Sequence, residues 1–201
     1  MIANSTIENH FPFCMQQGAD SSFIDKQRIR EFAAQHLPVT QKQINNAVKE
    51  HLVFLQNGGA GGQWKTIHIK GIVLALYFGK EIPFGKQANF ELQRFTEEIT
   101  LEKRILPFSN FCGSIIEKVN FKNSDLSYSM LTDVTGQSAN FENAQLAYTD
   151  FTRANLENAN FQNANLIGAD FENCHLSGAD FRGANLSQAR FPGAILKKVR
   201  I

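Results

Sequence analysis

The sequence Ala154-Asn-Leu-Glu-Asn-Ala-Asn-Phe-Gln-Asn-Ala-Asn-Leu-Ile-Gly168 carries the pattern that specifies the fold of this chain. Its residues Leu156, Phe161 and Leu166 are large, apolar and spaced five apart, and an alanine precedes each of them by two positions. Neither the 3.6-residue period of a helix nor the two-residue period of a strand divides five, so either element would scatter these side chains over both faces. The pattern therefore predicts a backbone that turns a corner every five residues.

The same period extends from Leu106 to Ile201. Every fifth position in this range is large and apolar except Gly136. From residue 139 to residue 194 the position two residues earlier is alanine, apart from Thr149 and Cys174, and we interpret Cys174 as a packing residue. A second pattern of period five is thus interlocked with the first. At Gly136 we expect a local bulge or distorted corner, and the alternative is a projecting loop that meets a partner.

Stretches such as Ala154-Asn-Leu-Glu-Asn158 and Ala184-Asn-Leu-Ser-Gln188 match the consensus A-(D/N)-L-x-x, so residues 106–201 resemble the pentapeptide-repeat family. The resemblance implies a mainly β fold, a right-handed quadrilateral β-helix of about five coils with four pentads in each. In such a solenoid the central residue of each pentad and the small residue before it point inward. At the usual strand spacing the solenoid would be roughly 20 to 25 Å long.

A coil of four pentads sorts the central side chains onto four faces. It places phenylalanine on two opposite faces and leucine on the other two, so aromatic rings stack in ladders across a narrow core. One aromatic face would hold Phe151, Phe171 and Phe191, and the opposite face Phe141 and Phe161.

Residues 1–105 show no such repeat, and we predict a mixed α/β capping region there. Capping boxes and apolar stripes predict helices near 22–37 and 40–57, and alternating apolar residues followed by a buried run predict a strand near 64–78. We expect the helices to cover the N-terminal end of the solenoid and the strand to form its first layer. For residues 86–104 we expect a helix, with pentads in a register shifted by one residue as the alternative.

The composition gives no sign of binding to nucleic acid or to a membrane. The formal net charge of +1 provides no long-range attraction to either. The longest apolar run, residues 71–78, is far shorter than the roughly 20 residues of a membrane helix, and the N-terminus lacks the pattern of a signal peptide. We therefore expect a cytoplasmic protein.

No catalytic residue, cofactor site or metal site can be defined from the sequence. Cys14, Cys112 and Cys174 are odd in number and widely spaced, which argues against a disulfide framework and a zinc site. No histidine lies in a cluster with metal spacing, and no Ser-His-acid group can be assigned. Because members of the resembled family generally act without catalysis, we do not expect an enzyme.

One candidate interaction surface is aromatic and aliphatic. Tyr128 stacks below Tyr148 one coil apart, and Ala147 and Ile167 flank them. Exposed patches of this kind are over-represented in interfaces. The alternative is that the N-terminal half or a dimer mate covers the patch.

A second candidate surface is an acidic stripe. Asp150 and Asp170 stack one coil apart with Arg190 next in the same column, and Glu172 and Glu157 lie nearby. Like charges at strand spacing are unfavourable unless they are compensated. We interpret the stripe as a solvated acidic strip that Arg190 partly relieves, and an acidic docking stripe is the alternative.

These features predict a non-catalytic protein-interaction scaffold whose protein partner the sequence does not identify. The family resemblance also allows a DNA mimic that binds a type II topoisomerase (gyrase) and protects it from inhibitors. Residues 121–196 carry four basic against eight acidic residues, however, and a net charge of −4 is weak for imitating a duplex. The C-terminal end of the solenoid is apolar with interspersed basic residues, which predicts a homodimer through Ile195, Leu196, Val199 and Ile201.

Overall fold

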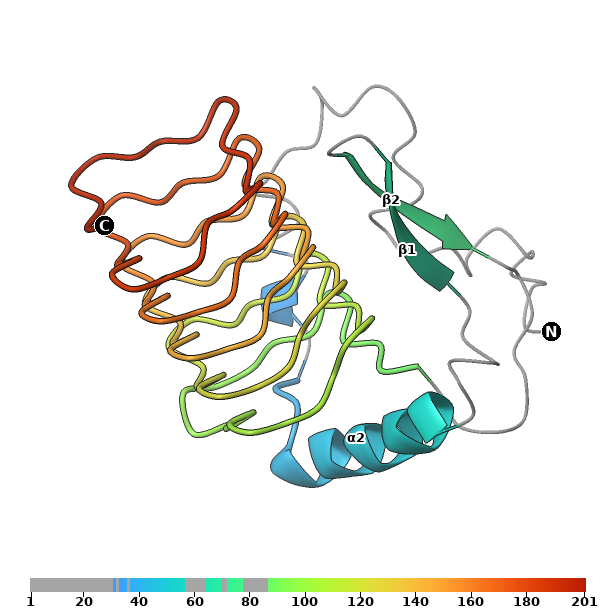
Figure 1. Cartoon of the computed structure of the whole chain (residues 1–201). Coiled ribbons are helices and arrows are strands. Elements are labelled where there is room, and N and C mark those ends of the chain that lie inside the picture. The colour runs from blue at the N-terminus through green and yellow to red at the C-terminus, as the bar shows by residue number, and fades with distance from the viewer. Residues whose placement is uncertain (1–30, 32, 36, 57–63, 70–71, 78–86) are drawn as a thin grey trace, which may run out of the picture.

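The computed structural model describes one long helix, a β-hairpin and a stack of coils (Figure 1). Helix α2 spans Gln41–Gln56, and strands β1 (Trp64–Ile69) and β2 (Ile72–Tyr77) pair antiparallel in a two-stranded sheet. Residues 31 and 33–35 are also helical. The described part of the chain comprises residues 31, 33–35, 37–56, 64–69, 72–77 and 87–201.

The coils are joined by parallel backbone bridges between residues twenty apart, such as Asn120 to Asn140 and Asn140 to Asn160. The Phe141 N–H donates to the Asn160 carbonyl at 2.7 Å, and the Asn160 N–H donates to the Ala139 carbonyl at 3.0 Å. Each coil is thus bonded to the next through short parallel ladders, one on each side. The expected four-sided coil of four pentads is confirmed.

A tight turn at each corner explains the period of five. The Ala144 N–H donates to the Phe141 carbonyl at 3.0 Å, and Asn143 between them has a φ of 57°. A positive φ at the third residue, together with this hydrogen bond, defines a type II turn, which asparagine and glycine tolerate best. The Asn140 Oδ1 accepts the N–H of Glu142 at 3.1 Å. Asn or Asp before the central residue therefore holds the turn in place.

Phenylalanine rings fill the core in two stacks that meet edge to face. The rings of Phe141 and Phe161 are parallel within 4° at 5.0 Å, and those of Phe151 and Phe171 within 2° at 5.0 Å. Phe151 meets Phe161 at 84° and 5.8 Å across the core. All four side chains are fully buried. The predicted opposition of phenylalanine to phenylalanine is confirmed, in geometries that aromatic rings favour.

Gly136 continues the coil without a bulge. Its N–H donates to the Asn155 carbonyl at 2.8 Å, and its own carbonyl accepts the Ala139 N–H at 3.1 Å, as at other central positions. A Cβ on Gly136 would lie 3.1 Å from the side chains of Ile116 and Leu156, one coil away on either side. The expected bulge is wrong, because these two neighbours already fill the space that a central side chain would occupy.

The first coil begins before the predicted boundary at residue 106. The bridge from Asn89 to Asn110 spans 21 residues, whereas the bridges from Thr100 onward span twenty. The corner after Phe95 holds the extra residue and lacks the positive φ of the other corners. The predicted helix over 86–104 is therefore wrong for the described residues from 87 onward, which form pentads in a shifted register.

Helix α2 closes the N-terminal end of the stack (Figure 1), as the capping prediction requires. Its Ile44 and Val48 are buried in the same core cluster as the coil residues. The Gln41 side chain accepts the N–H of Thr100 at 3.2 Å and donates to the carbonyl of the same residue at 3.3 Å. The helix therefore both covers the apolar core and forms hydrogen bonds with the backbone edge of the first coil.

His51 of α2 forms the most enclosed of these polar contacts. Its Nδ1 accepts the Ala88 N–H at 3.1 Å, so Nε2 carries the hydrogen and donates to the Pro107 carbonyl at 2.8 Å. The imidazole is fully buried, and burial lowers the pKa of His51 to about 4, although the bond to Pro107 acts in the opposite direction. The cap is therefore held by a neutral histidine.

The strand expected near 64–78 is the hairpin of β1 and β2. These two strands pair with each other, and the first layer of the stack is the coil that begins near Ala88. The expectation that the strand forms this layer is therefore wrong. Most of the helix expected near 22–37 lies outside the described residues. No helix among the residues that the structure describes is long and apolar enough to cross a membrane.

Candidate functional site

An aromatic ladder, defined here as Phe108, Tyr128 and Tyr148, runs along one corner of the solenoid. The rings of Phe108 and Tyr128 stack at 5.2 Å and 12°, and those of Tyr128 and Tyr148 at 5.1 Å and 19°. All three side chains are half-buried. The Tyr128 N–H donates to the Ala147 carbonyl at 2.9 Å, and the Tyr148 N–H donates to the Ile167 carbonyl at 2.8 Å. The structure thus brings the four residues predicted for this surface together.

The ladder occupies backbone positions that bulky side chains rarely adopt. The φ angles of Phe108, Tyr128 and Tyr148 are 62°, 59° and 57°. Asparagine, which tolerates this conformation best after glycine, stands at equivalent positions elsewhere, such as Asn143 and Asn158. A left-handed conformation costs an ordinary residue about 1–2 kcal/mol, which ring stacking partly offsets. Lys118 and Arg153 adopt the same conformation, so the positive φ belongs to the corner turn and does not by itself mark a functional site.

Gly168 ends the ladder. It has a φ of 64°, and a Cβ there would lie 2.5 Å from Cε1 of the Tyr148 ring, so the ring rests on the glycine backbone. Sequence reasoning missed both Phe108 and Gly168 as parts of this surface. The signal was available, because Phe108 precedes Tyr128 by one coil and Gly168 follows Tyr148 by one coil.

The predicted acidic stripe is partly paired with arginine, through Asp170. Asp150 and Asp170 are bridged across adjacent coils, and the Asp170 carboxylate contacts Arg190 at 3.1 Å with only 7% of its side chain exposed. Burial raises the pKa of both Asp150 and Asp170 above the usual range. The Glu172 N–H donates to Asp170 at 3.0 Å. These contacts favour the interpretation of a relieved strip over a docking stripe.

The surroundings of the stripe weaken its acidic character further. Glu157 belongs to the next corner, where its N–H donates to Asn155, so the structure does not bring it into line with the aspartates. Arg153 forms a two-pronged pair with Asp133 at 2.8 and 2.6 Å, beside the stripe. No group of three or more His, Cys, Asp or Glu residues in the described ranges is placed to hold a metal ion.

The residues predicted for homodimer contact lie at the end of the stack opposite α2 (Figure 1). Ile195 is 46% exposed, Leu196 47% and Ile201 88%. Val199 is partly buried against the core. This end is therefore apolar and open in the structure.

The architecture and the comparisons with known proteins agree. The bonded four-sided coils make the C-terminal part of the chain a β-solenoid. Residues 139–178 and 159–197 match the family model of pentapeptide repeats, in eight copies. Residues 139–197 therefore carry pentapeptide repeats, as the consensus indicated. No curated protein matches the sequence.

Several solved structures of pentapeptide-repeat proteins are similar to the chain. The pentapeptide repeat protein Rfr23 from the cyanobacterium Cyanothece 51142 is 31% identical over 49% of this chain and 65% of its own, with a TM-score of 0.41. HetL from Nostoc sp. strain PCC 7120, involved in heterocyst differentiation regulation, is 24% identical over 55% and 65%, with a TM-score of 0.25. QnrB1, a plasmid-mediated fluoroquinolone resistance protein, is 17% identical over 57% and 67%, with a TM-score of 0.35. The chain spans less than two thirds of the length of Rfr23 and HetL.

Proposed function

We propose that this protein is a non-catalytic scaffold that binds a protein partner through the aromatic ladder and the adjoining Ala147 and Ile167. The observation that carries the proposal is the stacking of three half-buried aromatic side chains at successive positions of one corner, with ring centroids 5.1 to 5.2 Å apart. Partly exposed aromatic side chains gathered in one place are characteristic of protein-binding surfaces.

The ladder has the chemistry of a protein-binding surface. Tyrosine presents a large apolar ring with a polar hydroxyl, and it is enriched at interfaces and at their energetic centres. Tyr128 and Tyr148 are held by ring stacking and by backbone bonds to the next coil. Because these side chains are already ordered, their immobilisation would add little to the entropy cost of binding a partner.

A photo-cross-linking experiment tests the proposal. The photoreactive residue p-benzoylphenylalanine is placed at Tyr148 in the full chain, in cells of the native host. Asn158 is the matched control, because it stands on the opposite corner with a φ of 58° and also rests on a glycine, Gly178. We expect a cross-link to a second protein from position 148 and none from position 158. Cross-linking only within the chain, at unchanged mass, would refute the proposal.

A double substitution, Tyr128→Asn with Tyr148→Asn, separates binding from folding. Asparagine stands at several equivalent corners, such as Asn143 and Asn158, so the solenoid should keep its stability within about 1 kcal/mol. Binding of the cross-linked partner, once purified, should weaken by about tenfold or more. Equal affinity of the variant and the unchanged protein in calorimetry would contradict the proposed surface.

The DNA-mimic function remains an alternative that charge disfavours. A mimic must present an extended acidic surface. Here Asp133, Asp170 and Asp180 each pair with arginine at 2.6 to 3.1 Å. A gyrase supercoiling assay distinguishes the two functions: inhibition by the purified protein would favour the mimic, and an unchanged rate would favour the scaffold.

A further inference from the structure

The regular spacing of the aromatic ladder restricts what can lie along it. Its rings follow one another at 5.2 and 5.1 Å, one ring for each coil of the solenoid. An α-helix repeats the same face with every turn of about 5.4 Å, whereas an extended strand does so every two residues, or about 6.7 Å. Over the two intervals of the ladder a helix keeps its register within about 0.5 Å, and a strand loses it by about 3 Å.

The backbone N–H groups at this corner are already bonded. Those of Tyr128 and Tyr148 donate to the next coil, at the carbonyls of Ala147 and Ile167. The Ser127 N–H donates to a carboxylate oxygen of its own coil at 3.0 Å. Strand addition requires main-chain donors that are still available, whereas a helix satisfies its own backbone. The corner therefore favours a helix that binds through its side chains.

The surroundings of the ladder are acidic. The corner and its flanks comprise residues 105–110, 125–130, 145–150 and 165–170. Together they contain three aspartates and no lysine, arginine or histidine. Asp170 is paired with Arg190, but no ion pair among the described residues includes Asp125, which is partly exposed. A basic side chain of a partner would complement this carboxylate.

We propose that the aromatic ladder binds an amphipathic α-helix of the protein partner. The helix lies parallel to the solenoid axis, with apolar side chains against the rings and basic side chains towards Asp125. This inference rests on the proposed function and adds the class of segment that is bound. Because the ladder contains three rings, about three helical turns, or roughly eleven residues, would cover it.

Cross-linking from the two ends of the ladder measures the spacing of the bound segment. p-Benzoylphenylalanine is placed at Phe108 in one sample and at Tyr148 in another, in the full chain in cells of the native host. The cross-linked residues of the partner are then mapped by mass spectrometry. A helix would place the two sites about seven residues apart, and an extended segment about three residues apart. We expect the helical spacing.

The outcomes separate this inference from the proposed function. Sites about three residues apart, or in unrelated segments, would overturn the helix and leave the proposed interface intact. The absence of any cross-link to another protein from either position would refute the proposed function itself. Cross-linked peptides that belong to a second copy of this chain would overturn the inference in favour of a homodimer.

A synthetic peptide of the cross-linked segment tests its conformation. α-Aminoisobutyric acid is introduced at two positions between the mapped contacts, where its second methyl group restricts the backbone to helical φ and ψ angles. Such preorganisation should make the modified peptide bind the full chain about three- to tenfold more tightly than the unmodified peptide in calorimetry. Weaker binding of the modified peptide would overturn the helix.

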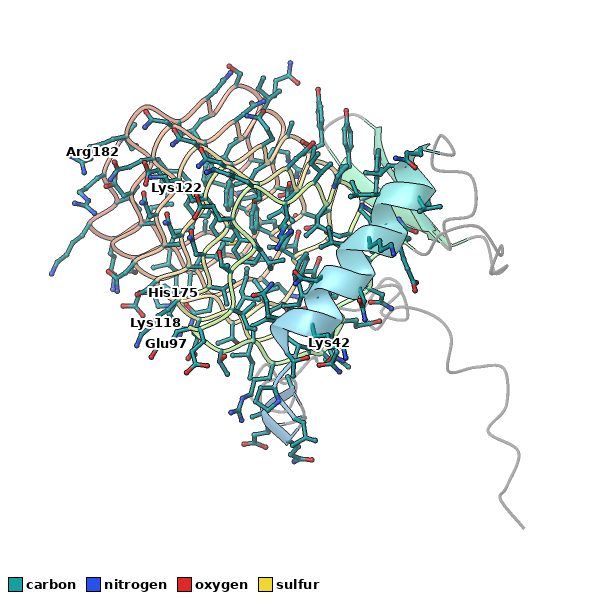
Figure 2. All side chains as sticks on the ribbon, turned by 90° about the horizontal axis from the view of Figure 1, so that it is seen from below. Lys42, Glu97, Lys118, Lys122, His175 and Arg182 are labelled. Atoms are coloured by element: carbon teal, nitrogen blue, oxygen red, sulfur yellow. The ribbon has the colours of Figure 1, made fainter. Side chains whose placement is uncertain are left out.

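Removal of one charge tests the basic side chains of the helix. Asp125→Asn retains an acceptor for the Ser127 N–H and should weaken binding of the unmodified peptide by about two- to fivefold. Glu97→Gln is the matched control, because Glu97 pairs with Lys118 (Figure 2), half a coil away from Phe108. It should leave the affinity unchanged. Equal affinities of the two variants would overturn the choice of a basic helix.

Discussion

The two ends of the solenoid differ in how they finish the same repeating core. At the N-terminal end, α2 buries Ile44 and Val48 against the first coil and bonds to its edge through Gln41 and His51. At the C-terminal end, Leu196 is half exposed, and the N–H groups of Leu186 and Phe191 donate to no backbone carbonyl among the described residues. A repeat can therefore propagate a core but cannot close one, because each coil leaves the same open edge for the next.

Closing an end requires side chains that the repeat does not contain. A backbone edge needs donors and acceptors as well as apolar cover. The buried ring of His51 accepts one hydrogen bond and donates another. The Gln41 side chain likewise accepts one hydrogen bond from Thr100 and donates one to it. These contacts join residues 37 to 59 positions apart in the sequence, so they depend on the docking of α2.

The largest expected effect is a difference in the free energy of unfolding between a substitution in an inner coil and the same substitution in the C-terminal coil. Phe161→Ala should lower the free energy of unfolding by about 3–5 kcal/mol, because it leaves a cavity between fully buried rings. Phe191→Ala should cost roughly half as much, since that ring is only partly buried. Chemical denaturation measures both. Equal costs would show that the C-terminal end is covered in solution.

The second prediction concerns the closed end and pH. The pKa of His51 is about 4 in the folded protein, below the ordinary value of 6.5, so the unfolded chain binds the proton more readily. The contribution of His51 to the free energy of unfolding is therefore fully present above pH 6.5. It is lost as the pH drops towards 4, and the total loss is roughly 3 kcal/mol. Denaturation at a series of pH values measures this loss. In His51→Gln the slope between these pH values should flatten, and an unchanged slope would assign it to other groups.

A third prediction tests how the cap pairs with the coil edge. Gln41→Ala removes both side-chain hydrogen bonds to Thr100 and should cost about 1 kcal/mol. Amide hydrogen exchange at Thr100 should become faster. Lys42→Ala, at the neighbouring exposed position, is the control and should leave that exchange rate unchanged. Unaltered exchange in Gln41→Ala would mean that α2 does not protect the edge through this side chain.

The smallest effect is expected at the open end. Ile201 is 88% exposed, so Ile201→Ser should change the free energy of unfolding by less than about 0.5 kcal/mol. Denaturation at low and high protein concentration measures this. A larger loss that appears only at high concentration would reveal contact between chains at this end, and the C-terminal end would then be closed by a second copy.

The coils were predictable from the sequence because each one is specified by contacts within and between neighbouring pentads. Each pentad repeats the same turn, the same small inward residue and the same large inward residue, so Phe141 and Phe161 meet equal surroundings. The prediction failed over 87–104, where the six-residue corner after Phe95 shifts the phase and the remaining apolar spacing also fits a helix. It failed at Gly136, because the sequence does not show that Ile116 and Leu156 fill its place.

The aromatic ladder was predictable only in part. The spacing of one coil is enough to place Tyr128 under Tyr148. The positive φ of both residues follows from the turn that they share with corners such as Lys118 and Arg153, so the stacked rings, and not the backbone, distinguish the ladder. The pairing of Asp170 with Arg190 was visible as a column, whereas the sharing of Asp180 by Arg182 and Arg200 became apparent only from the coordinates.

The four-sided coil, the faces of its core and the columns of its surface all follow from the amino-acid sequence. Those features depend on contacts between neighbouring pentads and neighbouring coils, which a period of five and a step of twenty specify. The start of the first coil and its closure by His51 are properties of the folded molecule alone. These depend on contacts between a helix and a solenoid that share no period, and such packing is set by shape and buried hydrogen bonds.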